Sequence, residues 1–247
     1  MKAVILAAGR GSRMMKLTQD RPKCLVELGG RSLLDLQLNA LGAGGARDIA
    51  VVGGYRSEFF DGRNVTVFEN ARWAETNMVA SLMCAASWLR EEPCIVSYSD
   101  IFYPIETVRR IIKGVGDVLI TFDPEWEPLW RARFADPLSD AETFKLDSEG
   151  RVTSIGGRAK TLDEINGQYM GLLKFTPAGW REVERYVSGF TPDKRDKIDM
   201  TQLLSQLINE GVEIRAVPTV PGWGEVDSES DLDYYTGEVN AGRIQLV

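Results

Sequence analysis

The sequence of 247 residues contains no histidine. This absence excludes imidazole acid–base catalysis, Ser–His and Cys–His nucleophile pairs, and zinc or iron sites built on histidine. Carboxylate or lysine chemistry and hard-metal phosphoryl or nucleotidyl transfer remain. Such transfer requires positioning and charge neutralisation rather than a base that titrates near pH 7.

Cysteine is also scarce, and long apolar runs are absent. Cys24, Cys84 and Cys94 are an odd number without CxxC spacing, as expected of buried, reduced thiols in a cytosolic protein. No apolar run reaches the length of a membrane span, and the apolar start is too short for a secretory signal. We therefore expect a cytoplasmic protein that does not bind membranes.

The charge balance is acidic, with 29 basic and 36 acidic residues and a net charge of −7. This balance argues against broad binding of nucleic acid. An apolar fraction of 44% is enough for the core of one sizeable α/β domain. The sequence is compatible with a homodimer but does not fix the oligomeric state.

Apolar runs alternate with helical patterns along the chain, which indicates a mostly parallel sheet with helices on both faces. Residues 123–165 depart from this pattern and are predicted to form a small β-rich insertion or an acceptor lid, with a hairpin formed by 143–146 and 152–155. The predicted strands are 3–6, 48–55, 65–68, 93–100, 117–122, 167–175 and 213–217, and the predicted helices are 32–41, 76–89, 105–112, 179–187, 200–208 and 231–239.

The N-terminus carries the strongest functional signal. An apolar run, Ala3 to Ala8, leads into Gly9-Arg10-Gly11-Ser12-Arg13, and Arg21-Pro22-Lys23 follows. A buried strand that ends in a glycine loop presents backbone N–H groups, and nearby cations make a polyphosphate the natural ligand. A P-loop is excluded because the Gly-Lys-Ser/Thr that it requires is missing. A dinucleotide-binding fingerprint is excluded because Met14 stands where its third glycine is needed.

The longer string is more specific. Leu6-Ala7-Ala8-Gly9-Arg10-Gly11-Ser12-Arg13, followed by Arg21-Pro-Lys23-Cys-Leu-Val26, resembles the signature of nucleotidyltransferases that join a nucleoside triphosphate to a phosphorylated small molecule. The resemblance implies a Rossmann-like, GT-A-like sheet, a loop of residues 6–13 around the triphosphate, and Arg13 and Lys23 on its charge. Together with the change of pattern after residue 122, this predicts one domain over 1–247, with a nucleotide half at 1–122 and an acceptor half at 123–247.

Two aspartates are candidates for a metal site. Asp100 follows the strand 93–100, and Asp227 ends the strand-like segment Trp223-Gly-Glu225-Val-Asp227. Mg²⁺ takes one or two carboxylates together with phosphate oxygens, and ligands bind at the carboxyl ends of parallel strands. The alternatives are a turn residue at 100 and a helix cap at 227. The resemblance places metal ligands at both positions, and Glu225, on the same face as Asp227, would contact metal or acceptor.

The candidate base and acceptor residues depend mainly on resemblance. Asn77 reads as a helix cap, but the segment Asn77-Met78 resembles phosphocholine cytidylyltransferases near the pyrimidine base, and Ser99 joins the nucleotide set. Segments 123–143 and 168–172 resemble cytidylyltransferases that act on phosphocholine, 2-aminoethylphosphonate, 2-hydroxyethylphosphonate or phosphoglutamine. The predicted acceptor residues are Trp126, Trp130, Arg131, Arg133, Glu142, Lys160, Gln168, Tyr169, Asp199 and Glu225.

Individual roles follow from side-chain chemistry. Arg131 or Arg133 could fork onto a phosphonate, and an ammonium could stack on Trp126 or Trp130 near Glu142. Tryptophans in a loop are, however, most often packing anchors. By resemblance, a lysine at position 160 holds the acceptor phosphate. Asp199 is predicted first to begin a helix, and the resemblance implies that it also faces the acceptor pocket.

The resulting hypothesis is a Mg²⁺-dependent cytidylyltransferase that transfers CMP from CTP and releases pyrophosphate. The alternative is a sugar-1-phosphate nucleotidylyltransferase using UTP or dTTP, but its usual Glu-Lys-Pro segment is replaced by Ile155-Gly-Gly-Arg158. A glycosyltransferase would call for Asp-x-Asp, and Ser97-Tyr-Ser-Asp100 supplies one acid. A catalytically silent nucleotide sensor is disfavoured, because it would not need both of the predicted metal-binding aspartates, Asp100 and Asp227.

Overall fold

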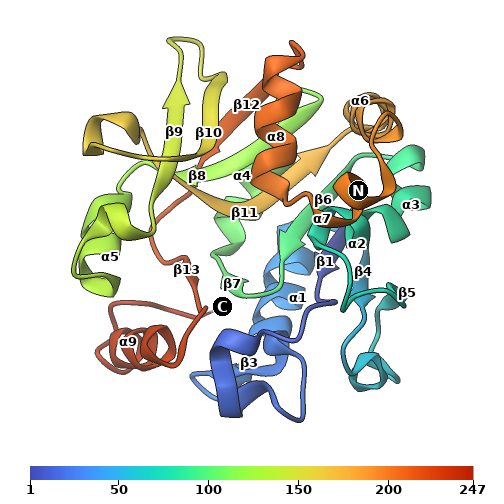
Figure 1. The fold of residues 1–247 in the computed structure, drawn as a ribbon. Coiled ribbons are helices and arrows are strands. Elements are labelled where there is room, and N and C mark those ends of the chain that lie inside the picture. Colours follow the sequence, from blue (N-terminus) through green and yellow to red (C-terminus); the bar gives the residue numbers. More distant parts are fainter. Residues whose placement is uncertain (247) are drawn as a thin grey trace.

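The computed structural model describes residues 1–246, without the side chains of Met15 and Lys16. A seven-stranded sheet in the order β12-β8-β11-β6-β1-β4-β5 forms its centre (Figure 1). β11 pairs antiparallel with β6 and β8, and the other neighbours pair in parallel, which confirms the mostly parallel sheet. The strands are β1 (Lys2–Leu6), β4 (Asp48–Gly53), β5 (Thr66–Glu69), β6 (Cys94–Tyr98), β8 (Val118–Asp123), β11 (Gln168–Phe175) and β12 (Ile214–Pro218).

Helices cover both faces of this sheet. Along β1, Ala3 and Ile5 join one core cluster, and Val4 and Leu6 join another, because successive side chains of a strand point to opposite faces. A strand buried on both faces reads as an unbroken apolar run, as residues 3–8 do. The first face is covered by α1 (Leu33–Gly44) and α4 (Ile105–Lys113), and the second by α2 (Met78–Cys84), α3 (Ala86–Glu91), α6 (Pro177–Ser188) and α8 (Met200–Asn209).

Local capping explains where two of these helices begin. Ser32 caps α1 as predicted, since its hydroxyl accepts a hydrogen bond from the Asp35 amide at 3.0 Å. The predicted helix 76–89 is in fact two helices, because Ala85 leaves the helical conformation at φ −95° and ψ 12°. Asn77 caps the first of them, with its side-chain oxygen 2.8 Å from the Met78 amide.

Smaller elements surround the carboxyl end of the sheet. The predicted hairpin is present, and the period-free segment before it contains helix α5, which tolerates Pro128 because the first-turn amides of a helix have no intrahelical partner. These elements are β2 (Glu27–Leu28) with β3 (Arg31–Ser32), β7 (Ile101–Phe102) with β13 (Gly224–Glu225), β9 (Glu142–Leu146) with β10 (Val152–Arg158), α5 (Trp126–Arg133), α7 (Pro192–Lys197) and α9 (Glu229–Asn240).

Short 3₁₀ helices complete the described chain: η1 (Ser12–Thr18), η2 (Lys23–Leu25), η3 (Ser57–Phe60), η4 (Pro137–Ser139) and η5 (Leu162–Glu164). A third core cluster, which includes Leu28, Phe102 and Tyr235, joins α9 to the β2–β3 ribbon and to β7. Within residues 1–246, no helix has the length and apolar character needed to cross a bilayer.

Candidate active site

The glycine loop after β1 is shaped by its approach to Lys23. Gly11 has a left-handed backbone at φ 71°, and a Cβ there would lie 2.7 Å from the Cβ of Lys23. Position 11 therefore requires glycine for two independent reasons, its backbone angle and the passing side chain. The Thr18 hydroxyl donates to the Gly11 carbonyl at 2.9 Å and closes the loop onto η1.

A two-residue ribbon brings the two candidate metal acids together. Asp100 follows β6 and precedes β7, and Asp227 lies two residues beyond β13. β7 and β13 pair antiparallel with Ile101 opposite Glu225, and the Val226 amide donates to the Asp100 carbonyl at 2.8 Å. The strand-end reasoning is thus correct for Asp100, whereas Asp227 reaches the site only through this long-range pairing.

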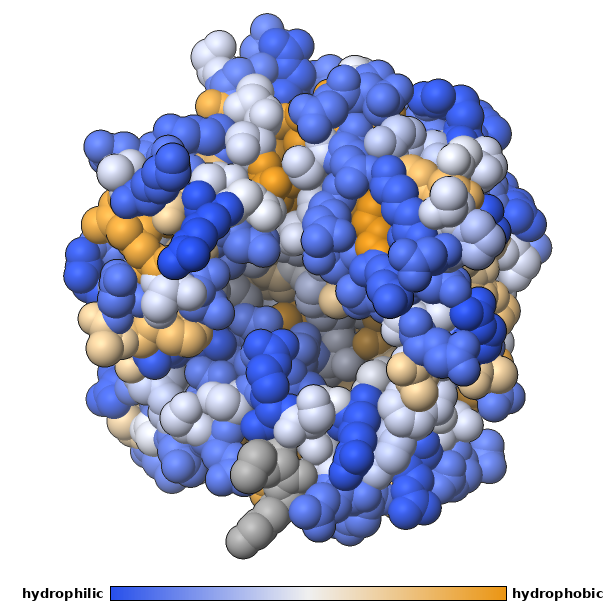
Figure 2. All heavy atoms as spheres, viewed as in Figure 1, coloured by the Kyte–Doolittle hydropathy of each residue, from blue (hydrophilic) through white to orange (hydrophobic). Residues whose placement is uncertain are grey.

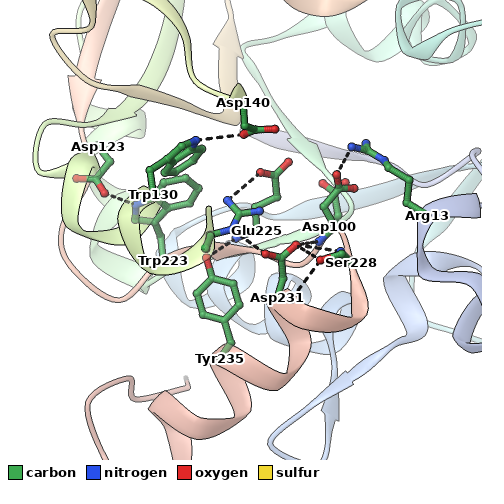
Figure 3. A network of polar contacts seen from close by, with 12 residues as sticks. Arg13, Asp100, Asp123, Trp130, Asp140, Trp223, Glu225, Ser228, Asp231 and Tyr235 are labelled. Carbon is green, nitrogen blue, oxygen red and sulfur yellow. Dashed lines mark hydrogen bonds and ion pairs between the residues drawn. The ribbon is translucent and has the colours of Figure 1, made fainter. Parts of the chain in front are cut away.

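Lys23 lies between these two carboxylates. Its Nζ is 2.7 Å from Asp100 Oδ2 and 2.5 Å from Asp227 Oδ1, and its side chain is 8% exposed. Burial alone would lower the pKa of Lys23, but the charges and hydrogen bonds of Asp100 and Asp227 outweigh it and raise the pKa. Arg13 forms an ion pair with the other oxygen of Asp227, Oδ2 (Figure 3). Asp100 Oδ1 is buried and has no hydrogen-bond partner within the part of the chain that the structure describes.

Two adjoining pockets open at this cluster, and Figure 2 shows the face hollowed at its centre. The glycine-loop pocket, of about 430 Å³, is lined by residues of the β1 loop, Lys23, the start of α2 and the end of β6. The acidic pocket, of about 340 Å³, is named for its five carboxylates, Asp140, Glu142, Asp199, Glu225 and Asp227. Arg13, Met78, Tyr98 and Asp227 line both pockets.

Most of the predicted nucleotide residues line the glycine-loop pocket. The exceptions are Ala7, whose amide donates to the Val52 carbonyl, and Arg10, whose guanidinium lies over the Tyr55 ring at 5.6 Å. Lining residues that the sequence analysis missed are Trp73, Thr76, Ser81 and Tyr98. Tyr98 had a readable signal, since it directly precedes Ser99 and Asp100 at a strand end. The predicted residues on the wall are Leu6, Ala8, Gly9, Gly11, Ser12, Arg13, Lys23, Asn77, Met78, Ser99, Asp100 and Asp227.

Arg133 belongs to a buried ion-pair network. Its side chain is 2% exposed, its Nε donates to Asp231 at 2.8 Å, and an Nη lies 3.4 Å from Glu225 (Figure 3). Burial opposes its charge, but the hydrogen bond to Asp231 and the nearby carboxylates raise the pKa of Arg133. The guanidinium thus binds carboxylates of its own chain, and the fork of Arg133 onto a phosphonate stays a prediction.

Asp231 connects this network to Asp227. One of its oxygens accepts from the Asp227 amide at 3.0 Å and from the Ser228 amide at 2.9 Å. Ser228, and not Asp227, caps α9 in a capping box with Asp231, so the cap alternative for Asp227 is excluded. The spacing Ser228-x-x-Asp231 was a readable signal for this arrangement.

The tryptophans of α5 are packing residues. Trp126 and Trp130 are 4% and 1% exposed and belong to a core cluster, so an ammonium cannot stack on them as predicted. Trp130 Nε1 instead donates to Asp140 at 3.1 Å, and Trp223 Nε1 donates to Asp123 at 2.8 Å. The ring of Trp130 also supports the Arg133 guanidinium at 4.9 Å. These rings position charged groups at the pocket.

Two further predicted acceptor residues lie off the acidic pocket. Arg131 is exposed and pairs with Glu127 one turn earlier on α5, and the exposed Lys160 hydrogen-bonds Glu164 through its backbone amide. The predicted residues on the wall are Arg133, Glu142, Gln168, Tyr169, Asp199 and Glu225, and the missed ones are Asp140, Met170, Gly171, Met200, Thr201 and Trp223. Asp199 also caps α8, with Oδ1 2.8 Å from the Gln202 amide.

The carboxylates of the acidic pocket disturb one another. Burial, followed by the charges of Asp199 and Asp140, raises the pKa of Glu142. Burial and the charge of Asp100 raise the pKa of Glu225 to about 7, although Arg133 works in the opposite direction. In a site so rich in negative charge, bound cations are favoured over additional anions.

The fold and the site define a nucleotidyltransferase. Residues 3–161 match the MobA-like NTP transferase domain, and the chain belongs to this family. It is 36% identical to the CTP:phosphoglutamine cytidylyltransferase of Campylobacter jejuni subsp. jejuni over 249 aligned residues. The alignment covers 94% of this chain and 98% of that protein.

Solved structures share the fold. The inositol-1-phosphate CTP transferase from T. maritima superposes with a TM-score of 0.76 at 18% identity, covering 99% of this chain and 97% of that one. The CTP:phosphocholine cytidylyltransferase from Streptococcus pneumoniae gives 0.71 at 20% identity, covering 96% and 98%. These two likenesses confirm the predicted nucleotidyltransferase fold.

Replacing Arg133 by methionine should lower the free energy of unfolding by about 3–5 kcal/mol, because Asp231 and Glu225 lose their buried cation. Arg131→Met is the matched control on the same helix, since it removes an exposed ion pair and should leave stability within error. Urea unfolding measures both. Equal stabilities of the two variants would contradict the buried network.

The raised pKa of Glu225 predicts a pH dependence of stability. Between pH 4.5, the ordinary pKa of a glutamate, and about pH 7, the native protein binds the Glu225 proton more tightly than the unfolded chain does. The free energy of unfolding therefore falls as the pH rises through this range, and the stabilisation from the bound proton is lost above about pH 7. Glu225→Gln should therefore gain stability relative to wild type from about pH 5 to about pH 8, as followed by urea unfolding. Exposed Glu229→Gln serves as the control, and parallel curves for wild type and Glu225→Gln would refute the shift.

Proposed function

We propose that the protein transfers CMP from CTP to a small phosphorylated or phosphonate acceptor and releases pyrophosphate. The observation that carries this proposal is the meeting of the glycine-loop pocket and the acidic pocket at Arg13 and Asp227, beside Lys23. A donor in one pocket and an acceptor in the other would share a single set of charged groups. The identity to a CTP:phosphoglutamine cytidylyltransferase along nearly the whole chain supports CTP as the donor.

The donor would lie in the glycine-loop pocket. Ala8, Gly9, Gly11, Ser12 and Arg13 line it, so that backbone amides of this loop would bind a triphosphate while Arg13 and Lys23 offset its charge. Asn77, Met78 and Ser99 are on the same wall and are the candidates for base and ribose contacts. Apart from Asp227, every residue of this wall lies within 1–122, which supports the proposed division into a nucleotide half and an acceptor half.

Asp100 and Asp227 are the residues that would hold a metal ion. Their carboxylates share one cation at 2.7 and 2.5 Å, and Asp100 Oδ1 is buried without a partner in residues 1–246, as expected of an oxygen that binds a further cation. Nucleotidyltransferases of this family typically use a divalent metal, and oxygen donors of this kind suit Mg²⁺. When bound, the ion would neutralise charge on the α-phosphate and orient it.

The chemistry requires no protein base. An anionic oxygen of the acceptor attacks the α-phosphorus of CTP, a new P–O bond forms, and the bond to the β-phosphate oxygen breaks as pyrophosphate leaves. Lys23 and Arg13 offset the charge that develops on the phosphates. A chain without histidine can therefore perform the reaction.

The acidic pocket favours an acceptor that carries an ammonium. Five carboxylates line it, and its inner cation, Arg133, is already paired with Glu225 and Asp231. The aromatic side chains of Tyr98 and Tyr169 lie beside these acids and suit an alkylammonium. We therefore place 2-aminoethylphosphonate, phosphocholine and phosphoglutamine ahead of 2-hydroxyethylphosphonate and sugar phosphates.

Pyrophosphate release from the purified protein with Mg²⁺ tests donor and acceptor together. We expect turnover with CTP and with one of the ammonium-bearing acceptors, and little with ATP, GTP or UTP. In Glu142→Gln, discrimination between 2-aminoethylphosphonate and 2-hydroxyethylphosphonate should fall, because the neutral side chain attracts the ammonium less. Turnover with UTP or dTTP and glucose-1-phosphate alone would refute the proposal in favour of a sugar-phosphate enzyme.

Replacing Asp100 by asparagine should lower kcat by about 100- to 1,000-fold or more, because a charged group that stabilises the transition state is lost. The fold should remain, as checked by circular dichroism. Asp48→Asn, at the exposed start of β4, is the control and should keep wild-type activity. An Asp100→Asn protein with wild-type turnover in Mg²⁺ would exclude this carboxylate as a metal ligand.

A further inference from the structure

We infer that Lys23 and Arg13 occupy the carboxylates of Asp100 and Asp227 in place of the metal in the free protein, and transfer to the triphosphate when metal and nucleotide bind. This inference rests on the proposed function, because it requires a triphosphate to receive the two side chains. Its consequence is that the protein without nucleotide holds a divalent cation only weakly.

The contacts of the two carboxylates support this exchange. Of their four oxygens, Asp100 Oδ2 and Asp227 Oδ1 accept from Lys23, and Asp227 Oδ2 pairs with Arg13. Only Asp100 Oδ1 lacks a partner among the described residues. The Lys23 Nζ is within hydrogen-bond distance of both carboxylates. A metal ion that bound both carboxylates would need the same position, so the ammonium competes with it directly.

The charges of the exchange balance. Two carboxylates carry −2, and Lys23 and Arg13 supply +2, so the free site is neutral. A divalent cation that replaced the two side chains would keep that sum, and the released ammonium and guanidinium would each find oxygens on a triphosphate. Without the triphosphate, both cationic side chains would lose their partners, and for the buried Lys23 ammonium an unpaired charge is costly.

The placement of both side chains suits a move of this kind. Lys23 lines the glycine-loop pocket as well as contacting the carboxylates, and its stem passes Gly11, where no Cβ obstructs it. Arg13 is 75% exposed at its side chain and lines both pockets. Rotation of side-chain torsions is therefore enough to carry either charge from the carboxylates toward the loop.

Mn²⁺ titrated into the free protein and followed by electron paramagnetic resonance tests the inference without nucleotide or acceptor. Lys23→Met, which keeps the stem and removes the charge, should bind Mn²⁺ about 5- to 150-fold more tightly than wild type, the usual range for coupling between two sites. Mn²⁺ should also raise its Tm more than that of wild type.

Three controls make the result specific. Lys2→Met removes another lysine ion pair, to Glu91 at the opposite end of β1, and should bind Mn²⁺ as wild type does. Lys23→Arg keeps a cation and should also remain weak. The double variant Lys23→Met with Asp100→Asn should lose the gain, because it lacks a carboxylate that would hold the ion.

Equal Mn²⁺ affinities of wild type and Lys23→Met, or a gain that survives in the double variant, would overturn the inference. Should Lys23→Met fail to fold, Arg13→Met provides the same test, because its exposed side chain also occupies an oxygen of Asp227. The titration contains no CTP, so its outcome is separate from the pyrophosphate assay. A tight Mn²⁺ site in Lys23→Met, together with no CTP turnover by the wild-type protein, would uphold the occupied carboxylates and refute the function.

Discussion

Neutralisation of Asp100 and Asp227 by Lys23 is the interaction on which the site depends. Two carboxylates held this close repel each other unless a cation lies between them, and the repulsion grows as water is excluded. Lys23 supplies that cation at 2.7 and 2.5 Å and is itself buried. The glycine loop, the β7–β13 ribbon and both pockets are arranged around this contact, since each contributes one of its members or borders it.

A second layer of charge keeps the first in place. Arg133, held by Trp130 and two acids, balances Asp231, and Asp231 in turn binds the amides of Asp227 and Ser228. The tryptophans near the acidic pocket serve the same purpose through their indole N–H groups, which fix Asp140 and Asp123. Aromatic packing thus helps to position one carboxylate of the acidic pocket, Asp140, and a second acid outside its wall, Asp123.

Local pattern was sufficient for the fold class and for placing the glycine loop and Asp100 at the pocket. The apolar run before Gly9, the caps at Ser32 and Asn77 and the strand end before Asp100 were all readable, because each depends on neighbours within a few residues. The sequence did not reveal the carboxylate partners of Arg133 or the burial of Trp126 and Trp130, whose chemistry suited a ligand equally well. Whether such a side chain faces a pocket or the core depends on distant segments, here α9 and β13.

The sequence alone determined that a glycine loop with four nearby cations follows a buried strand, and that histidine chemistry is excluded. It also supplied the resemblance that identified the nucleotidyltransferase fold. The tertiary structure decided that Asp227 lies near Asp100, that Lys23 hydrogen-bonds both carboxylates, and that Arg133 pairs with Asp231 of its own chain. The physical reason is that backbone conformation is set by local sterics and capping, whereas the partner of a charged side chain is set by which distant strands pair.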